Sequence, residues 1–370
     1  MTTLDREIVR DSAMTEATLE EFYADIEAAN LPPLWKYLSQ LITTEPVPEA
    51  IPYKWSWDEV YPRILKAGNI PIERGGERRV LILNNPGLTH LKTATRNIYA
   101  GVQMVKPGEI APAHRHTQSA IRFIIQGNGG FTSVEGERCF MEQYDLVLTP
   151  PWQWHDHGNE TSEPVIWMDG LDINLLKSLG TSFFELYPDH RQPVSKPDNY
   201  HLKKYGGGNL MPAWSSPDTR YNATKVSPLL IYKWAKTYKA LHELAQVETS
   251  PYDDVFLTYT NPKTGGQVLP TLGCNAQMLR PGVHTKAHRH TTSAVYHVVD
   301  GTGYTVINGQ RFDWKKGDFV VLPPWVWHEH ANASQTAEAI LFSVTDIPVF
   351  EALGLYREEV YLENDGYQNV

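Results

Sequence analysis

Short, mostly apolar segments separated by glycine and proline dominate the middle and the end of the chain. They occupy residues 80–83, 121–125, 295–299 and 319–322. Gly-x-Gly triplets at 127–129 and 301–303 and Pro-Pro pairs at 150–151 and 323–324 interrupt them. Many short strands with turn signals and no helical periodicity predict a β-sandwich or small barrel, so the predicted fold class is mainly β.

Helical patterns lie outside these segments. Leu19, Phe22 and Ile26 recur at helical spacing in a helix that begins at Thr15 or at Thr18, and further helices are predicted near 34–41, 232–244 and 348–356. The predicted organisation is an N-terminal helical arm (1–75), a β domain (76–180), a linker with a helix (181–264), a second β domain (265–347) and a C-terminal helix (348–370).

A long internal repeat relates the two β domains. Its first copy contains Pro107-Gly108, His114-Arg115-His116 and Trp154-His155-Asp156-His157, and its second contains Pro281-Gly282, His288-Arg289-His290 and Trp327-His328-Glu329-His330. The first histidines are offset by 174 residues and the third by 173, and an Asp precedes the third histidine by ten residues in both copies. Such a repeat indicates a duplicated module.

Three histidines of the first copy have the spacing of metal ligands. His114 and His116 are two residues apart, so in a strand both side chains point to the same face. His155 follows 39 residues later, past two glycine-rich breaks, which suits a strand that returns to the same place. Three neutral imidazoles on a β scaffold can bind one divalent transition metal and leave the opposite positions open.

His288, His290 and His328 keep these spacings and form a second candidate metal set. The two copies differ at the position of Arg122, where the second carries Tyr296. We therefore predict that the first module is catalytic and that the second is structural or holds an accessory metal.

The two copies resemble the paired motifs of the cupin superfamily, which forms jelly-roll barrels with a metal in the mouth. More narrowly, the chain from about residue 30 to about 355 resembles the bicupin ring-cleaving dioxygenases of gentisate and related hydroxybenzoates. The stretches that carry the resemblance are 74–79, 113–123, 154–159 and 167–172. Many cupins have a Glu four or five residues after His-x-His, but Ala and a β-branched residue stand there in both copies, which favours a three-histidine site over an oxalate-acting bicupin.

This resemblance implies two jelly-roll barrels, Fe(II) on His114, His116 and His155, and a small aromatic acid and O2 as substrates. With gentisate, cleavage between the carboxyl-bearing and hydroxyl-bearing carbons would give maleylpyruvate. It also implies a homotetramer built with the N-terminal arm. The alternatives are a salicylate or 1-hydroxy-2-naphthoate dioxygenase and, in another class, a non-catalytic bicupin binding protein, against which the intact histidines of both modules argue.

Three more residues near the first set are candidates for chemistry. Arg122 lies six residues after His116 in what reads as one extended strand, so both side chains should face the same interior. The planar guanidinium of Arg122 matches a substrate carboxylate. The alternative is a structural ion pair with Asp169 or Asp172. His157 could move a proton or only support the metal ligands. Asp169 is a candidate to orient a histidine or an arginine.

The strand at 99–105 supplies the remaining candidates. Tyr99 and Gln103 are four residues apart, so in a strand their side chains point to the same face. In the family that this chain resembles, that face lines the substrate pocket. The resemblance favours Arg78 as a further substrate contact. A Tyr at position 99 is more similar to the gentisate enzymes than to the salicylate enzyme, which carries a Trp.

The charge of the chain and its cysteine content limit the expected binding partners and cellular compartment. Lys and Arg number 33 against 43 Asp and Glu, a formal charge of −10, and no basic run is present, so neither nucleic acid nor an anionic membrane surface is an expected partner. Cys139 and Cys274 are too few for a disulfide framework and predict free thiols. The N-terminal residues lack a signal-peptide pattern, so we expect a cytoplasmic protein.

Overall fold

A computed structural model describes residues 14–71, 79–208 and 226–370. The chain divides into two compact units, Met1–Val47 and Pro48–Val370. The first contains helices α1 (Glu16–Ala28) and α2 (Leu34–Leu41). Of the two predicted starts for the first helix, the structure selects Thr15, whose side chain accepts a hydrogen bond from the backbone N–H of Thr18.

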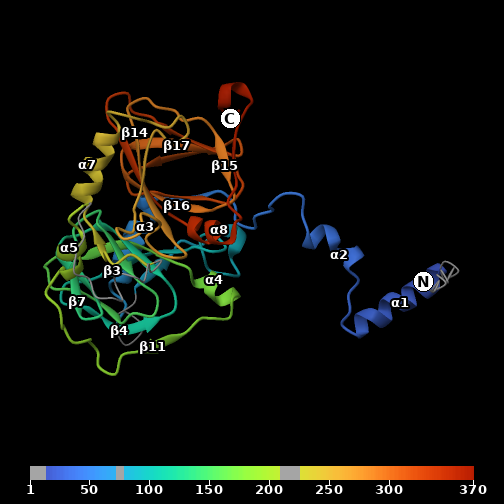
Figure 1. Ribbon diagram of the computed structural model, residues 1–370, viewed down its shortest axis with the longest axis horizontal. Coiled ribbons are helices and arrows are strands. Elements are labelled where there is room, and N and C mark those ends of the chain that lie inside the picture. The colour runs from blue at the N-terminus through green and yellow to red at the C-terminus, as the bar shows by residue number, and fades with distance from the viewer. Residues whose placement is uncertain (1–13, 72–78, 209–225) are drawn as a thin grey trace, which may run out of the picture. The chain divides into compact units, whose positions relative to one another are not determined.

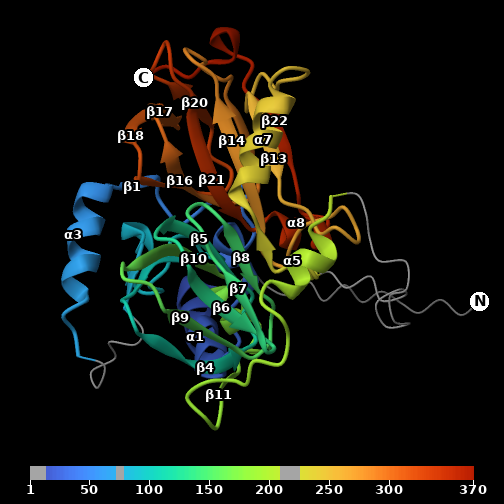
Figure 2. The ribbon, with the colours of Figure 1, turned by 90° about the vertical axis from the view of Figure 1, so that its left-hand side faces the viewer.

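The second unit contains two β modules, drawn in green and in orange to red in Figures 1 and 2. In the first module one sheet has the order β12-β8-β5-β10-β3-β2 and the other β11-β4-β9-β6-β7. The strands are β2 (Val80–Ile82), β3 (Tyr99–Val105), β4 (Ile110–His116), β5 (Ala120–Gln126), β6 (Gly130–Val134), β7 (Glu137–Phe140), β8 (Leu146–Thr149), β9 (His155–Asn159), β10 (Val165–Leu171), β11 (Phe184–Leu186) and β12 (Ile231–Tyr232).

The second module repeats this arrangement with sheets β1-β19-β16-β21-β14-β13 and β18-β17-β20-β15-β22. Its strands are β1 (Tyr53–Trp55), β13 (Val255–Thr258), β14 (Gly273–Leu279), β15 (His288–His290), β16 (Ala294–Asp300), β17 (Thr302–Ile307), β18 (Gln310–Lys315), β19 (Phe319–Leu322), β20 (His328–Asn332), β21 (Ala339–Thr345) and β22 (Glu358–Val360). The prediction of a mainly β chain with two jelly-roll barrels is confirmed.

The two modules share one hydrophobic core. Phe123 of β5 stacks on Phe342 of β21, with ring centroids 4.0 Å apart. Around this stack, equivalent polar contacts join the modules. Asp172 accepts hydrogen bonds from the Ser119 N–H and the Thr271 hydroxyl, and Asp346 accepts them from the Ser293 N–H and the Asn97 amide. The duplication therefore extends to the contacts between its two copies.

The helices of this unit are α3 (Trp57–Ala67), α4 (Ile173–Ser178), α5 (Tyr200–Tyr205), α7 (Trp234–Leu244) and α8 (Ile347–Leu353). The repeated Asp of the sequence motif fixes two of them. Asp145 accepts a hydrogen bond from the first N–H of α7, and Asp318 accepts one from the first N–H of α3. A carboxylate at a helix N-terminus satisfies an N–H group that has no partner within the helix.

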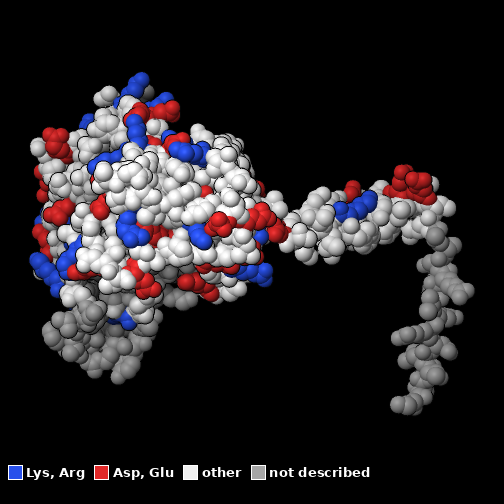
Figure 3. Space-filling view, turned by 90° about the horizontal axis from the view of Figure 1, so that it is seen from above, with Lys and Arg blue, Asp and Glu red and all other residues white. Residues whose placement is uncertain are grey.

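The predicted domain limits remain a prediction, and five strands lie outside the two predicted β domains, namely β1, β11, β12, β13 and β22. β1 comes from the predicted N-terminal arm and pairs with β19, and β13 comes from the predicted linker and pairs with β14. Both cysteines are buried free thiols, as predicted. None of the helices in the described ranges has both the length and the apolar character needed to cross a bilayer. Basic and acidic side chains are intermixed on the face of the molecule shown in Figure 3.

Candidate metal and substrate site

The first histidine set meets inside the first module. His114 and His116 lie on β4, and His155 lies on the neighbouring strand β9, directly opposite His114. The ring of His155 is 4.3 Å from that of His114 and 4.7 Å from that of His116, between centroids. One ligand atom from each residue lies within 4.8 Å of the others. The predicted convergence of the three imidazoles is therefore present.

Hydrogen bonds fix which nitrogen of each ring can bind a metal. Nδ1 of His114, His116 and His155 lies 2.8, 2.9 and 2.9 Å from the backbone carbonyls of residues 112, 118 and 153. A carbonyl only accepts, so each Nδ1 carries the proton and each Nε2 has a lone pair. In the part of the chain described, the buried Nε2 of His155 has no hydrogen-bond partner. These residues therefore suit a divalent metal such as iron.

Burial keeps His155 neutral. It lowers the pKa of His155 well below the usual value, and the neighbouring imidazoles of His114 and His116 lower it further. Metal ions bind unprotonated imidazole, so this shift favours the form of His155 that can bind a metal near neutral pH.

The second wall of the site comes from the other sheet of the module. Arg122 on β5 lies directly opposite Asp169 on β10, and their Nε and Oδ1 atoms are 3.5 Å apart. Arg122 Nη1 also donates a hydrogen bond to the hydroxyl of Thr149 on β8. Trp167 donates its indole N–H to Asp169 Oδ1 at 2.9 Å. Of the two predicted ion-pair partners of Arg122, Asp169 makes the contact. Asp172 instead accepts the hydrogen bonds that connect the two modules.

One step of the sequence reasoning about Arg122 is wrong. His116 ends β4 and Arg122 lies on β5, so the chain turns at residues 117–119 and crosses to the other sheet. Arg122 is nevertheless close enough to His155 and His157 for its charge to lower the pKa of both imidazoles. It therefore faces the histidines across the interior of the barrel instead of lying beside them.

Burial also shifts the pKa of both Arg122 and Asp169. It raises the pKa of Asp169 to about 6, although Arg122 and the Trp167 indole favour the carboxylate. Desolvation lowers the pKa of Arg122, and Asp169 opposes this effect. A guanidinium nevertheless stays protonated at neutral pH, because arginine is too strong a base to lose its proton there, so Arg122 gives the site a fixed positive charge.

His157 lies next to the histidine set on β9. Its Nδ1 is 3.0 Å from the Thr132 hydroxyl, and its ring centroid is 5.6 Å from that of Trp167. Burial, and after it the charge of Arg122, lowers its pKa well below the usual value, so the ring is neutral. The structure therefore places His157 between the histidines of one sheet and Trp167 of the other.

Tyr99 and Gln103 lie on β3, with Gln103 directly opposite Trp167 on β10. Burial, and after it the charge of Asp169, raises the pKa of the Tyr99 phenol, which keeps it protonated. A Cβ atom added to Gly101 would come within 2.6 Å of Val80 Cγ1 and 3.1 Å of the Tyr99 hydroxyl, so the close approach of Val80 favours glycine there and the Tyr99 hydroxyl adds to the crowding. Arg78, the further predicted substrate contact, lies outside the described residues.

The second histidine set has almost the same geometry. His288 on β15 lies directly opposite His328 on β20, and the ring centroids are 4.4 Å apart, with 4.9 Å between His290 and His328. Tyr296 and Ser343 occupy the register positions of Arg122 and Asp169, so these positions carry no ion pair. Both histidine sets are thus assembled, and the first is the one that faces the cation of Arg122.

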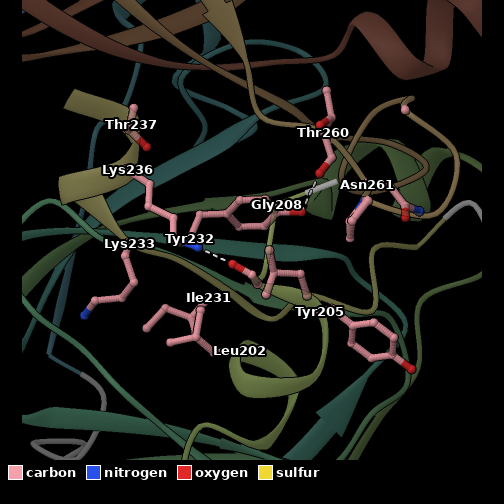
Figure 4. A pocket seen from close by; sticks show the side chains of 14 residues that line it. Leu202, Tyr205, Gly208, Ile231, Tyr232, Lys233, Lys236, Thr237, Thr260 and Asn261 are labelled. Carbon is pink, nitrogen blue, oxygen red and sulfur yellow. Dashed lines mark hydrogen bonds between the residues drawn. The ribbon is translucent and has the colours of Figure 1, made fainter. Parts of the chain in front are cut away.

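Sequence reasoning missed Thr149, Trp167 and Thr132. Trp167 precedes Asp169 by two residues on a strand, so strand alternation alone would have placed it on the same face. Thr149 and Thr132 could not be found in this way, because their partners Arg122 and His157 lie on strands far away in the sequence. A separate cavity of about 440 Å³ is lined by Tyr205, Tyr232 and Lys236 among others, and it contains none of the predicted site residues (Figure 4).

The fold and the paired histidine sets define a two-module cupin protein, and comparisons with known proteins agree. The family model described as "Cupin domain" matches residues 101–173 and 276–345. The 5-aminosalicylate 1,2-dioxygenase of Comamonas sp is 41% identical, covering 95% of this chain and 92% of that protein. Gentisate 1,2 dioxygenase 1 of Aquipseudomonas alcaligenes is 38% identical, covering 92% and 95%.

A crystal structure of the salicylate 1,2-dioxygenase of Pseudoaminobacter salicylatoxidans with gentisate is similar to this chain, with a TM-score of 0.86 and 34% identity. The match covers 96% of this chain and 98% of that one. The chain belongs to the bicupin family of ring-cleaving 1,2-dioxygenases, and it is an oxidoreductase of that class.

Proposed function

We propose that this protein is an Fe(II)-dependent gentisate 1,2-dioxygenase. It adds both atoms of O2 to gentisate and cleaves the ring between the carboxyl-bearing and hydroxyl-bearing carbons, which gives maleylpyruvate. The observation that carries the proposal is the arrangement of His114, His116 and His155 on one sheet opposite the buried Arg122 on the other. The gentisate-named relatives support the choice of substrate.

The three histidines would hold the iron through Nε2, because each Nδ1 is bonded to a carbonyl. Bound iron supplies the redox chemistry that lets an aromatic acid react with O2. The histidine set adds no negative charge, so the site keeps its attraction for an anionic substrate. Substrate capture thus uses local charge, although the whole chain carries −10.

Arg122 would bind the substrate carboxylate. Its Nε faces Asp169 and its Nη1 donates to Thr149, and these two contacts fix the plane of the guanidinium. A planar fork of fixed orientation recognises a carboxylate in one direction, so it would set the ring carbon to be attacked next to the histidines.

His157 would move a proton at the substrate hydroxyl. Its Nδ1 contacts the Thr132 hydroxyl, so Nε2 is the nitrogen available on the side of the site. A neutral imidazole can accept a proton from a phenol that becomes phenolate on binding. Asp169 would act through Arg122, as a positioning residue.

Tyr99 and Gln103 would line the part of the pocket that receives the ring. The Tyr at this position favours gentisate over salicylate, because the phenol leaves room and a polar atom for the second ring hydroxyl. A second substrate candidate is 5-aminosalicylate, on which the 41% identical relative is named to act. It differs from gentisate only by an amino group in place of the hydroxyl at ring position 5.

Assembly and location are also part of the proposal. We infer a cytoplasmic homotetramer built with the N-terminal helical arm, and its support is the resemblance described above. Sedimentation of the full chain, compared with a chain that begins at Pro48, would test the role of the arm.

A substrate panel on the iron-loaded protein tests the proposal. Oxygen uptake and the near-ultraviolet absorbance of the opened ring are followed with gentisate, 5-aminosalicylate, salicylate and 1-hydroxy-2-naphthoate. We expect gentisate to give the highest kcat/KM. A higher value with 5-aminosalicylate would assign that substrate instead, and no uptake with any of the four would support a binding protein without this activity.

A further inference from the structure

We propose that Arg115 is a positioning residue for the first histidine set. Its Cζ atom is 4.4 Å from the ring centroid of Trp152 and 4.4 Å from that of Trp154. These contacts tie β4, which carries two of the three histidines, to the segment that leads into His155. The inference rests on the part of the proposed function that places a metal on these histidines, and it does not depend on which aromatic acid is the substrate.

The side chain of Arg115 points away from the metal site. Arg115 lies between His114 and His116 on β4, and successive side chains of a strand point to opposite faces of the sheet. The two histidines face the interior of the barrel with His155, so Arg115 faces outward, and its side chain is 27% exposed. Any effect of Arg115 on a bound metal must therefore pass through the histidines.

Aromatic and acidic partners fix the guanidinium of Arg115. A cation within about 6 Å of an aromatic centroid is attracted to the ring, and the planar guanidinium also packs well on a flat ring. Arg115 makes this contact with both Trp152 and Trp154. Its Nε and Nη2 atoms lie 2.8 and 2.6 Å from one carboxylate oxygen of Glu185, which is directly opposite Arg115 on β11. The side chain thus connects β4, β11 and the segment 152–154.

The segment 152–154 sets the third histidine of the site. The carbonyl of Gln153, between the two tryptophans, lies 2.9 Å from Nδ1 of His155 and so fixes the orientation of that ring. The N–H of Trp152 donates to the carbonyl of His116, at 2.7 Å, so the segment is also bonded to the strand of the other two ligands. Arg115 packs on this segment from outside the barrel and holds both sets of ligands in one arrangement.

The backbone of Trp152 needs such support. Its φ is +60°, in the left-handed region that bulky residues seldom adopt, and a residue stays there only where its surroundings hold it. Trp325 at the equivalent position of the second module has a φ of +61°, and its N–H donates to the carbonyl of His290, at 2.7 Å. The same unusual turn is therefore kept in both copies.

The second module repeats the contacts of the arginine as well. Cζ of Arg289 is 4.2 Å from the ring centroid of Trp325 and 4.6 Å from that of Trp327, and its Nη2 is 2.7 Å from Glu359 on β22. The buried arginine proposed to bind the substrate is not repeated there. The arginine and its two tryptophans thus accompany the histidine sets and not the substrate groups, which supports a role in holding the histidines.

Anaerobic release of iron from the loaded full chain to a chromogenic Fe(II) chelator tests the proposal without turnover. The phase of release that is missing in His155→Ala identifies the iron of the first module. Arg115→Ala should make this phase about 10- to 100-fold faster, because loss of a residue that orients metal ligands weakens metal binding by about that factor. Arg115→Lys keeps the charge but not the planar group, so it should restore part of the slow release.

Arg289→Ala is the matched control, because it removes the same contacts in the other module. It should leave the release phase of the first module unchanged. Equal acceleration in Arg115→Ala and Arg289→Ala would indicate a general loss of stability and would overturn the proposal, as would wild-type release from a folded Arg115→Ala chain. A wild-type chain without any phase that depends on His155 would refute the proposed metal site, and this inference with it.

Trp152→Leu keeps the test decisive if Arg115→Ala folds poorly. Trp152 is 39% exposed, and the variant removes one of the two rings but retains the backbone N–H that bonds His116. The release phase of the first module should become about 2- to 5-fold faster, which corresponds to the loss of one exposed cation–π contact. Unchanged release in a folded Trp152→Leu chain would contradict the positioning role of Arg115.

Discussion

Replacing Arg122 by Lys keeps the positive charge of the pocket and removes the planar fork. The side chain is 4% exposed, so its contacts form away from water. A hydrogen bond to a charged group contributes about 1.5–3 kcal/mol, and a lysine in this place would lose at least one of the bonds to Thr149 and to the substrate carboxylate. This loss corresponds to a decrease of about 10- to 150-fold in kcat/KM for gentisate.

Steady-state oxygen uptake on iron-loaded protein measures this effect. Because the carboxylate is bound throughout the reaction, most of the change should be a higher KM, with a smaller change in kcat. Arg311→Lys is the matched control, since Arg311 lies on the surface of the second module and pairs with Asp313. Far-ultraviolet dichroism and iron content show whether the fold and the metal site are retained. A folded, iron-loaded Arg122→Lys protein with the wild-type KM would refute the assignment of Arg122 to the substrate carboxylate.

Three further substitutions test the structure. Thr149→Val removes the hydroxyl that holds Arg122, so KM for gentisate should rise about 5-fold while iron content stays constant; an unchanged KM would contradict this positioning role. Phe342→Ala removes half of the stack between the modules and should lower the free energy of unfolding in urea by about 3–5 kcal/mol; a loss under about 1 kcal/mol would show that the stack is not central to the core. Burial raises the pKa of Asp172 from 3.8 to about 6, so ionisation favours the unfolded state, and stability falls as pH rises between these values. Asp172→Asn removes this effect. The free energy of unfolding of the variant minus that of the wild type should therefore rise by about 2 kcal/mol between pH 4.5 and pH 7. A difference that does not change with pH would show that the pKa of Asp172 is not raised.

The repeat made both histidine sets predictable from the sequence. Two histidines at i and i+2 share a face in any strand, and equal spacings in two copies identify the third ligand without knowledge of the fold. The strand at Tyr99–Val105 and the helix at Leu34–Leu41 were likewise predicted from periodicity and turn signals alone.

Contacts between distant strands could not be predicted in this way. Asp253 and Glu358 approach His288 from segments 35 residues before it and 70 residues after it, and no local pattern records that approach. The same holds for Thr149 and Arg122, which meet only because β5 and β8 are neighbours in one sheet. The turn at 117–119 was missed because it contains neither glycine nor proline, and its Thr and Ser are also compatible with a continuous strand.

The role of Asp145 and Asp318 shows a different limit. Both belong to the repeat, but their position ten residues before a histidine does not reveal that they hold the starts of α7 and α3. A repeated residue near a metal motif can therefore serve the scaffold, and its partners decide which role it has.

The proposed reaction requires that His114, His116 and His155 hold the iron at which gentisate and O2 react. The decisive experiment is oxygen uptake with gentisate by the iron-loaded His155→Ala chain. His90→Ala is the control because His90 is exposed, distant from both histidine sets in the sequence, and pairs with Glu49. We expect His155→Ala to lose uptake and the iron of the first module while His90→Ala retains both. Wild-type uptake by the His155→Ala chain would disprove this role of the histidines.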